Sequence, residues 1–143
     1  MQNNNKHLAL TQKFSTWGDK LLQHTDVLNS IQNDKKFKPI TVQLSPCEVC
    51  SSGCPFCSVA ERPLKSYLPF EKIKQVLRDF KTLGAKSVEI TGGGEPMIYR
   101  DATTKDDINS IVEYAHELGY DIGIITNTLK LSRLKPENHD KVS

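Results

Sequence analysis

Four cysteines, the only ones in the sequence, lie within eleven residues of one another, with the spacing Cys47-x2-Cys50-x3-Cys54-x2-Cys57. A disulfide framework staples segments that are distant in the chain, and cysteines this crowded do not form one. Thiols clustered in this way are instead typical of a site that binds a metal ion or an iron-sulfur cluster.

The spacing of these cysteines helps to distinguish between metals. Structural zinc sites usually separate two Cys-x2-Cys pairs by a loop of about 12 to 20 residues, whereas here three residues separate the pairs. Low-potential ferredoxins use Cys-x2-Cys-x2-Cys-x3-Cys-Pro, which does not match either. The subset Cys50-x3-Cys54-x2-Cys57, with Phe56 directly before the last cysteine, resembles the radical SAM superfamily. A non-catalytic iron-sulfur or zinc module that uses all four cysteines remains the alternative.

The resemblance implies that Cys50, Cys54 and Cys57 hold a [4Fe-4S] cluster. A cluster with one open iron can bind and cleave a substrate, whereas a fully capped cluster only passes electrons. In the family, the open iron binds S-adenosylmethionine, and its reductive cleavage gives a 5'-deoxyadenosyl radical that abstracts hydrogen from the substrate. The resemblance also implies that Phe56 lies near the adenine. Its implied partners are a reductant such as flavodoxin or ferredoxin and an unidentified substrate, a small molecule or a peptide.

Cys47 is left over by this assignment and has two interpretations. In the first it is a fourth ligand, or a ligand to another cluster. In the second it is a small residue in the approach to the cysteine loop. We favour the second interpretation, because a fourth thiolate would block the iron that binds the cosubstrate.

A glycine run follows the cysteines at a distance, in the order Gly92, Gly93, Gly94, Glu95, Pro96. A glycine triplet alone is a turn signal. Glycines also let the backbone approach a ligand closely, and the Glu95 carboxylate is able to accept a hydrogen bond from an ammonium group. The run resembles the Gly-Gly-Glu-Pro motif with which radical SAM proteins bind the amino group of the methionine moiety. The resemblance therefore adds these five residues to the cosubstrate site.

Three short strands are predicted to position the two motifs. Residues 39–44, 87–91 and 121–126 are rich in apolar and β-branched side chains. The first strand leads into the cysteines and the second into the glycine run, so both motifs are expected at the carboxyl ends of neighbouring strands. Thr126 and Asn127 close the third strand and are interpreted as turn formers, outside the site.

Two helices are predicted between these strands. The first runs from Phe70 to Leu83 with apolar residues at steps of three and four, and Gly84 ends it. The second is expected to start near Thr104, as an N-cap, and to stop at Gly119. The alternation of strands and helices predicts an α/β fold with a parallel sheet and right-handed crossovers.

The resemblance to the radical SAM superfamily implies a partial (β/α) barrel, of which the first three β/α units are present. We expect a helical extension over residues 1–36 and a truncated core, the N-terminal half of the barrel, over 37–143. A truncated chain that folds poorly by itself is a further alternative, because a three-stranded sheet leaves an apolar edge exposed.

Composition sets the outer limits of these predictions. A chain of 143 residues, 37% of them hydrophobic, is able to bury one ordinary core. The net charge is +2 and the longest basic run is Lys35 to Lys36, so the sequence shows no footprint for nucleic acid or a membrane surface. No stretch approaches the roughly 18 apolar residues of a membrane span, and we expect a cytoplasmic protein.

Overall fold

The computed structural model describes most of the chain. The described residues are 24–34, 37–61, 66–127 and 130–142. Among them, no helix has the length and hydropathy that a membrane span requires.

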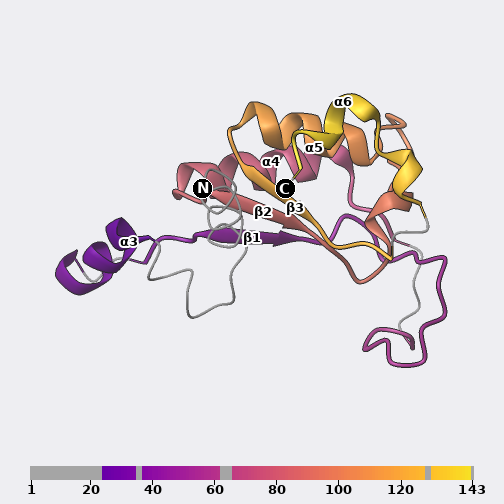
Figure 1. Cartoon of the computed structure of the whole chain (residues 1–143), viewed down its shortest axis with the longest axis horizontal. Helices are drawn as coiled ribbons and strands as arrows, with labels where there is room; N and C mark the ends of the chain where they lie inside the picture. The colour runs from indigo at the N-terminus through magenta and orange to yellow at the C-terminus, as the bar shows by residue number, and fades with distance from the viewer. Residues whose placement is uncertain (1–23, 35–36, 62–65, 128–129, 143) are drawn as a thin grey trace, which may run out of the picture.

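The centre of the molecule is a sheet of three parallel strands in the order β1-β2-β3. They are β1 (Thr41–Leu44), β2 (Ser87–Ile90) and β3 (Asp121–Ile124). Helix α4 (Phe70–Thr82) connects β1 to β2, and α5 (Ile108–Glu117) connects β2 to β3. Figure 1 shows both helices on the same side of the sheet. The α/β fold with parallel strands that the sequence predicts is confirmed.

The two faces of the sheet differ in chemistry because side chains alternate along each strand. Apolar residues of all three strands point into the core under the helices. The other face is polar over β1 and β2, where the Thr41 and Ser87 hydroxyls are 2.7 Å apart and Gln43 Nε2 donates to Glu89 Oε1 over 3.0 Å. These pairs are directly opposite each other in the strand register.

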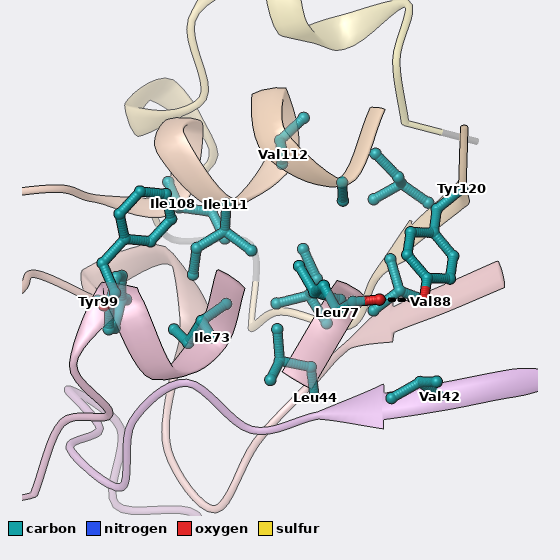
Figure 2. Packing of buried hydrophobic residues seen from close by; sticks show 14 of the residues in the cluster. Val42, Leu44, Ile73, Leu77, Val88, Tyr99, Ile108, Ile111, Val112 and Tyr120 are labelled. Carbon is teal, nitrogen blue, oxygen red and sulfur yellow. Dashed lines mark hydrogen bonds between the residues drawn. The ribbon is translucent and has the colours of Figure 1, made fainter. Parts of the chain in front are cut away.

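The core lies between the sheet and the two helices (Figure 2). Ile73 and Leu77 of α4 are fully buried, as the predicted apolar stripe requires. The Tyr120 hydroxyl donates to the Leu77 carbonyl over 2.7 Å, and burial raises the pKa of Tyr120 to about 12. Gly84, with φ of +100°, follows the end of α4 in a conformation that glycine adopts readily.

Helix α5 begins at Ile108, later than predicted, and the prediction that Thr104 is its N-cap is wrong. The side chain of Asp101 accepts hydrogen bonds from the backbone amides of Thr103 and Thr104, so these residues form a separate turn. Asp101 also accepts from the amide of Phe70, and this bond is the main cause that lowers the pKa of the Asp101 carboxyl. Asp107 is the true N-cap of α5.

The segment after β3 has too few apolar residues for a prediction from sequence, and it forms a 3-10 turn η3 (Leu131–Arg133) and a short helix α6 (Pro136–His139). Beyond α6, Val142 forms a parallel bridge to Ile122 of β3. The sheet therefore has a further parallel neighbour at its β3 edge, as continuation of a β/α series requires.

The predicted N-terminal helices fall only partly on described residues. Helix α3 (Thr25–Asn29) continues into a π-helical turn (Ser30–Asp34), and the Asp26 carboxylate pairs with Lys86 Nζ over 2.9 Å beside the start of β2. Residues 1–23, on which the rest of the prediction rests, lie outside the described residues. The division of the chain at residue 36 stays a prediction.

Candidate active site

The cysteine loop and the glycine run lie against each other beyond the ends of β1 and β2. The amide of Gly94 donates to the Cys47 carbonyl over 3.1 Å, and the amide of Glu95 donates to the Val49 carbonyl over 2.8 Å. The Gly93 amide adds a hydrogen bond of 2.8 Å to the Ser45 hydroxyl. The residues paired here are 46 to 48 positions apart in the sequence, and the parallel sheet brings them together.

Gly92 and Gly94 are positions in the run where a side chain is excluded. A Cβ placed at Gly94 would lie 2.1 Å from the Val49 carbonyl oxygen. The sequence predicts that these glycines let the backbone approach a ligand closely. At Gly94, the group that the backbone approaches is the chain's own cysteine loop. A Cβ at the exposed Gly92 would lie 2.6 Å from the Gly94 carbonyl oxygen, and Gly93 is half-buried.

Glu95 is almost completely buried, with 2% of its surface exposed. Its Oε1 accepts from the Met97 amide over 2.9 Å and from the Thr126 hydroxyl over 2.6 Å. Its Oε2 accepts from the Asn127 amide over 2.8 Å. The carboxylate therefore joins the end of β2 to the end of β3. Pro96, buried beside it, opens the 3-10 turn η2 (Pro96–Ile98).

Asn127 connects the third strand to the cysteine loop, since its Nδ2 donates to the Ser52 hydroxyl over 2.8 Å. The sequence predicts that Thr126 and Asn127 are turn formers outside the site, whereas in the structure both donate to Glu95. The signal that identifies them is their position: they follow a buried strand parallel to the two strands whose ends carry the motifs.

The three cysteines proposed as ligands lie on one short loop. Cys50 and Cys57 are exposed, Cys54 is half-buried, and all three are free thiols. Phe56, between them, is 87% exposed. Within the described ranges, no three Cys, His, Asp or Glu side chains are close enough together to share a metal ion. The donor set, three free thiols on one loop, is chemically suited to an iron-sulfur cluster.

Cys47 has a different environment from the other three cysteines. It is 2% exposed, and its Sγ donates to the Glu95 carbonyl over 3.4 Å. Burial raises the pKa of the Cys47 thiol to about 11. Because metals bind the thiolate, a buried thiol that stays protonated at neutral pH is a poor ligand. The geometry favours the interpretation of Cys47 as a structural residue.

Comparison with protein families decides which family these motifs represent. The family model of the radical SAM superfamily matches residues 44–142, which include the cysteine loop, the glycine run and the β3 end. The chain belongs to the radical SAM superfamily. The membership that the cysteine and glycine motifs predict is confirmed.

Curated relatives within the radical SAM superfamily carry the names of enzymes. GTP 3',8-cyclase of Staphylococcus aureus (strain Mu50 / ATCC 700699) is 28% identical over 118 residues, which are 75% of this chain and 33% of the relative. Molybdenum cofactor biosynthesis protein 1 of Drosophila melanogaster is 34% identical over 97 residues, 65% of this chain and 16% of the relative. The chain spans a third or less of the length of these relatives.

Two solved structures share the fold. Streptococcus suis SuiB bound to S-adenosylmethionine superposes with a TM-score of 0.59 at 22% identity, covering 98% of this chain and 31% of that one. SuiB bound to its precursor peptide SuiA gives a TM-score of 0.58 at 24% identity, covering 84% and 26%. The parallel sheet and its helices therefore share the fold of these structures, in agreement with the partial barrel that the sequence predicts.

Proposed function

We propose that this chain is the part of a radical SAM enzyme that binds the [4Fe-4S] cluster and S-adenosylmethionine. The observation that carries the proposal is the pair of backbone hydrogen bonds from Gly94 to Cys47 and from Glu95 to Val49. They fix the base of the thiol-bearing loop against the glycine run, at the carboxyl ends of parallel strands where such folds bind ligands.

Cys50, Cys54 and Cys57 would hold the cluster, which when bound supplies the electron that cleaves S-adenosylmethionine and so starts radical chemistry. Cys47 stays neutral and packs under Glu95, leaving one iron free of protein thiolate. The three ligands lie on a loop whose far part, around Phe56, is exposed, and Phe56 would lie near the adenine. This arrangement favours an open iron over a four-cysteine module.

The glycine run would receive the amino group of the methionine moiety. Gly92 and Gly93 have no side chain in the way, and Gly94 and Pro96 hold the run in place. Glu95 uses three of the roughly four acceptor positions of a carboxylate on donors of this chain, which leaves one for an ammonium group. We assign Glu95 both a direct contact to the cosubstrate and the positioning of the β3 end.

The substrate class follows from the relatives only in outline. A relative is named for its action on GTP, and SuiB has been solved with a precursor peptide. We propose that the substrate here is a small molecule or a peptide, that a flavodoxin or ferredoxin supplies the electron, and that the enzyme works in the cytoplasm, where thiols stay reduced.

Anaerobic reconstitution with iron and sulfide tests the proposal directly. We expect the reduced full chain to give the electron paramagnetic resonance signal of a [4Fe-4S]+ cluster, and the signal to shift when S-adenosylmethionine is added. Cys54→Ala should lose the cluster, whereas the matched variant Cys47→Ala should keep both the signal and the shift. A signal that ignores the cosubstrate, or a tightly held zinc ion in place of iron, would support the four-cysteine module instead.

A further inference from the structure

A cavity of about 710 Å³ opens beside the cysteine loop, and the site described above does not account for it. Ser51 of the loop and Tyr67, at the return of the loop, form one wall. The turn η2 and the segment after β3 form the others. The volume is within the range of about 300 to 1,000 Å³ that is usual for small-molecule sites.

The charged side chains around the cavity are mostly basic. Arg100, Lys130 and Arg133 line it, against one acidic side chain, Asp107. Among the described residues, no ion pair involves any of the three basic side chains. Asp107 already uses one carboxylate oxygen within the chain, because its Oδ1 accepts from both the backbone amide and the side-chain Nδ2 of Asn109. Among the described side chains that line the cavity, three basic ones thus stand against one acidic one.

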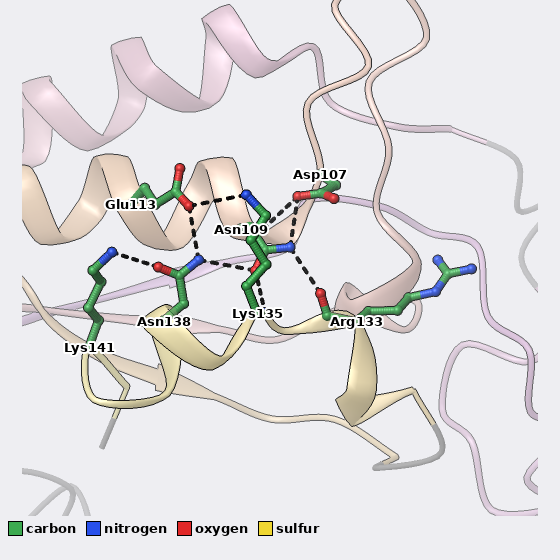
Figure 3. A network of polar contacts seen from close by, with 7 residues as sticks. All are labelled: Asp107, Asn109, Glu113, Arg133, Lys135, Asn138 and Lys141. Carbon is green, nitrogen blue, oxygen red and sulfur yellow. Dashed lines mark hydrogen bonds and ion pairs between the residues drawn. The ribbon is translucent and has the colours of Figure 1, made fainter.

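Arg133 is held in place by a network of buried amides (Figure 3). Its backbone carbonyl accepts from Asn109 Nδ2 over 2.9 Å, and its Nη1 donates to the Met97 carbonyl over 3.4 Å. Asn109, which is 2% exposed, accepts in turn from Nδ2 of the fully buried Asn138 over 3.1 Å. Because these partners fix the backbone that carries Arg133, the ordering cost of binding a ligand falls mainly on the guanidinium side chain.

The remaining wall of the cavity is aromatic and apolar. Tyr67 is 38% exposed, and its ring lies 6.4 Å from that of Tyr99, whose hydroxyl donates to the Leu68 carbonyl over 2.8 Å. Ile98 and the buried Ile108 complete this side. A ligand with an anionic group at one end and a planar or apolar body at the other would match both walls.

We propose that this cavity binds the phosphate or carboxylate group of a small organic ligand, with Arg133, Arg100 and Lys130 as the anion-binding residues. That the ligand is the substrate of the radical reaction rests on the proposed function, since Ser51 of the cavity wall lies between Cys50 and Cys54. The binding of the anion itself does not require the cluster.

The test uses the metal-free full chain, labelled with 15N and titrated with inorganic phosphate in one series and glutarate in another, at constant ionic strength. We expect saturable shifts of amides in residues 98–100, 107–108 and 130–133. The anion that binds more tightly identifies the ligand as a phosphate or a carboxylate. The absence of saturable shifts in these residues with both anions overturns the proposal.

Variants separate a site from general attraction to a basic surface. Arg133→Gln should weaken the binding of the better anion by about tenfold or more, as loss of a charge-assisted hydrogen bond predicts. Lys130→Gln should act in the same direction. The control is Arg78→Gln, an exposed arginine on α4 that donates to the Tyr114 hydroxyl over 2.9 Å. Equal weakening in the control overturns the proposal.

The cluster and cosubstrate provide an independent readout. If neither anion binds while the reconstituted chain still shows a signal shift with S-adenosylmethionine, the anion site is wrong and the proposed function stands. If the anion binds but no cluster forms, the anion site stands by itself.

Discussion

The carboxylate of Glu95 accepts a hydrogen bond from the backbone amide of Asn127 over 2.8 Å, although the two residues end different strands. The side chain of Asn127 then donates to Ser52, so the contact extends to the cysteine loop. Three segments that leave the same edge of the sheet are joined through one buried acidic side chain. Glu95 therefore links the geometry of the glycine run to that of the loop that carries the thiols.

Replacing Glu95 by Gln tests this link, because Gln keeps the shape but turns one acceptor oxygen into a donor. One of the three donors now bonded to Glu95 is left facing an NH2 group. We expect the free energy of unfolding to fall by about 1 to 3 kcal/mol, the cost of a buried unsatisfied polar group. Chemical denaturation of the metal-free chain measures it. The control, Glu89→Gln on the polar sheet face, keeps an oxygen for Gln43 and should change stability by less than about 0.5 kcal/mol. Equal effects of the two variants would contradict the structural role of Glu95.

Gly94→Ala should disturb the cysteine loop through the backbone. The new methyl group would lie 2.1 Å from the Val49 carbonyl oxygen, so the loop base or the glycine run has to move. We expect a loss of about 1 to 3 kcal/mol of stability, as for overpacking elsewhere, together with a clear drop in iron bound after reconstitution. Gly53→Ala is the matched control, because an added Cβ meets nothing within 4 Å there. If Gly94→Ala binds as much iron as Gly53→Ala, the contact does not position the ligands.

The strands and the two long helices were predictable from sequence because each has a clear periodicity and a clear stop. Ile73 and Leu77 are fully buried at the predicted helical spacing, and Gly84 ends the segment. The start of α5 could not be predicted from sequence, because Thr104 and Asp107 are both good N-cap residues. The choice between them depends on Asp101, which takes the Thr104 amide into a turn, and on the contact of Asp101 with Phe70 31 residues earlier.

The candidate site was predictable as two motifs but not as a network. Cysteine and glycine spacing identifies the loop and the run, whereas two of the three donors to Glu95 follow β3 and depend on tertiary contacts. The segment after β3 was missed for a related reason. Besides the buried Leu134, it is anchored by Asn138, which is fully buried and hydrogen-bonded to Asn109 and Glu113. A buried amide is not visible as such in a hydropathy pattern.

Asn138→Ala should therefore loosen the segment after β3. It removes the donors to Asn109 Oδ1 and Glu113 Oε1 and leaves a cavity in their place. We expect a loss of about 1 to 3 kcal/mol in the free energy of unfolding and faster amide exchange in residues 131–139. Asn29→Ala, at an exposed position of α3, is the control and should leave both quantities unchanged. Unchanged exchange in Asn138→Ala would show that apolar contacts hold the segment.

The pH dependence of stability distinguishes between a structural role of Cys47 and a role as a metal ligand. Burial raises the pKa of the folded thiol to about 11 from an ordinary value of 9.0. Below pH 9 the thiol is protonated in both the folded and the unfolded chain, so its contribution to stability does not depend on pH. As pH rises towards 11, the unfolded chain loses the proton first and stability falls.

With allowance for solvent screening, the fall due to Cys47 should reach about 1 to 2 kcal/mol between pH 8 and pH 11. The variant Cys47→Ala lacks this thiol. Burial raises the pKa of Tyr120 in both proteins and is the main cause that raises the pKa of Tyr99, to which Cys47 adds only the smallest contribution, so the tyrosine effects largely cancel in the comparison. The measurement is the difference in free energy of unfolding between the two proteins, taken by denaturation at each pH without metal. We expect the advantage of the original chain over Cys47→Ala to shrink as pH rises. A constant difference would mean that the thiol is not held in its buried, protonated form, and the fourth cysteine would again be a candidate ligand.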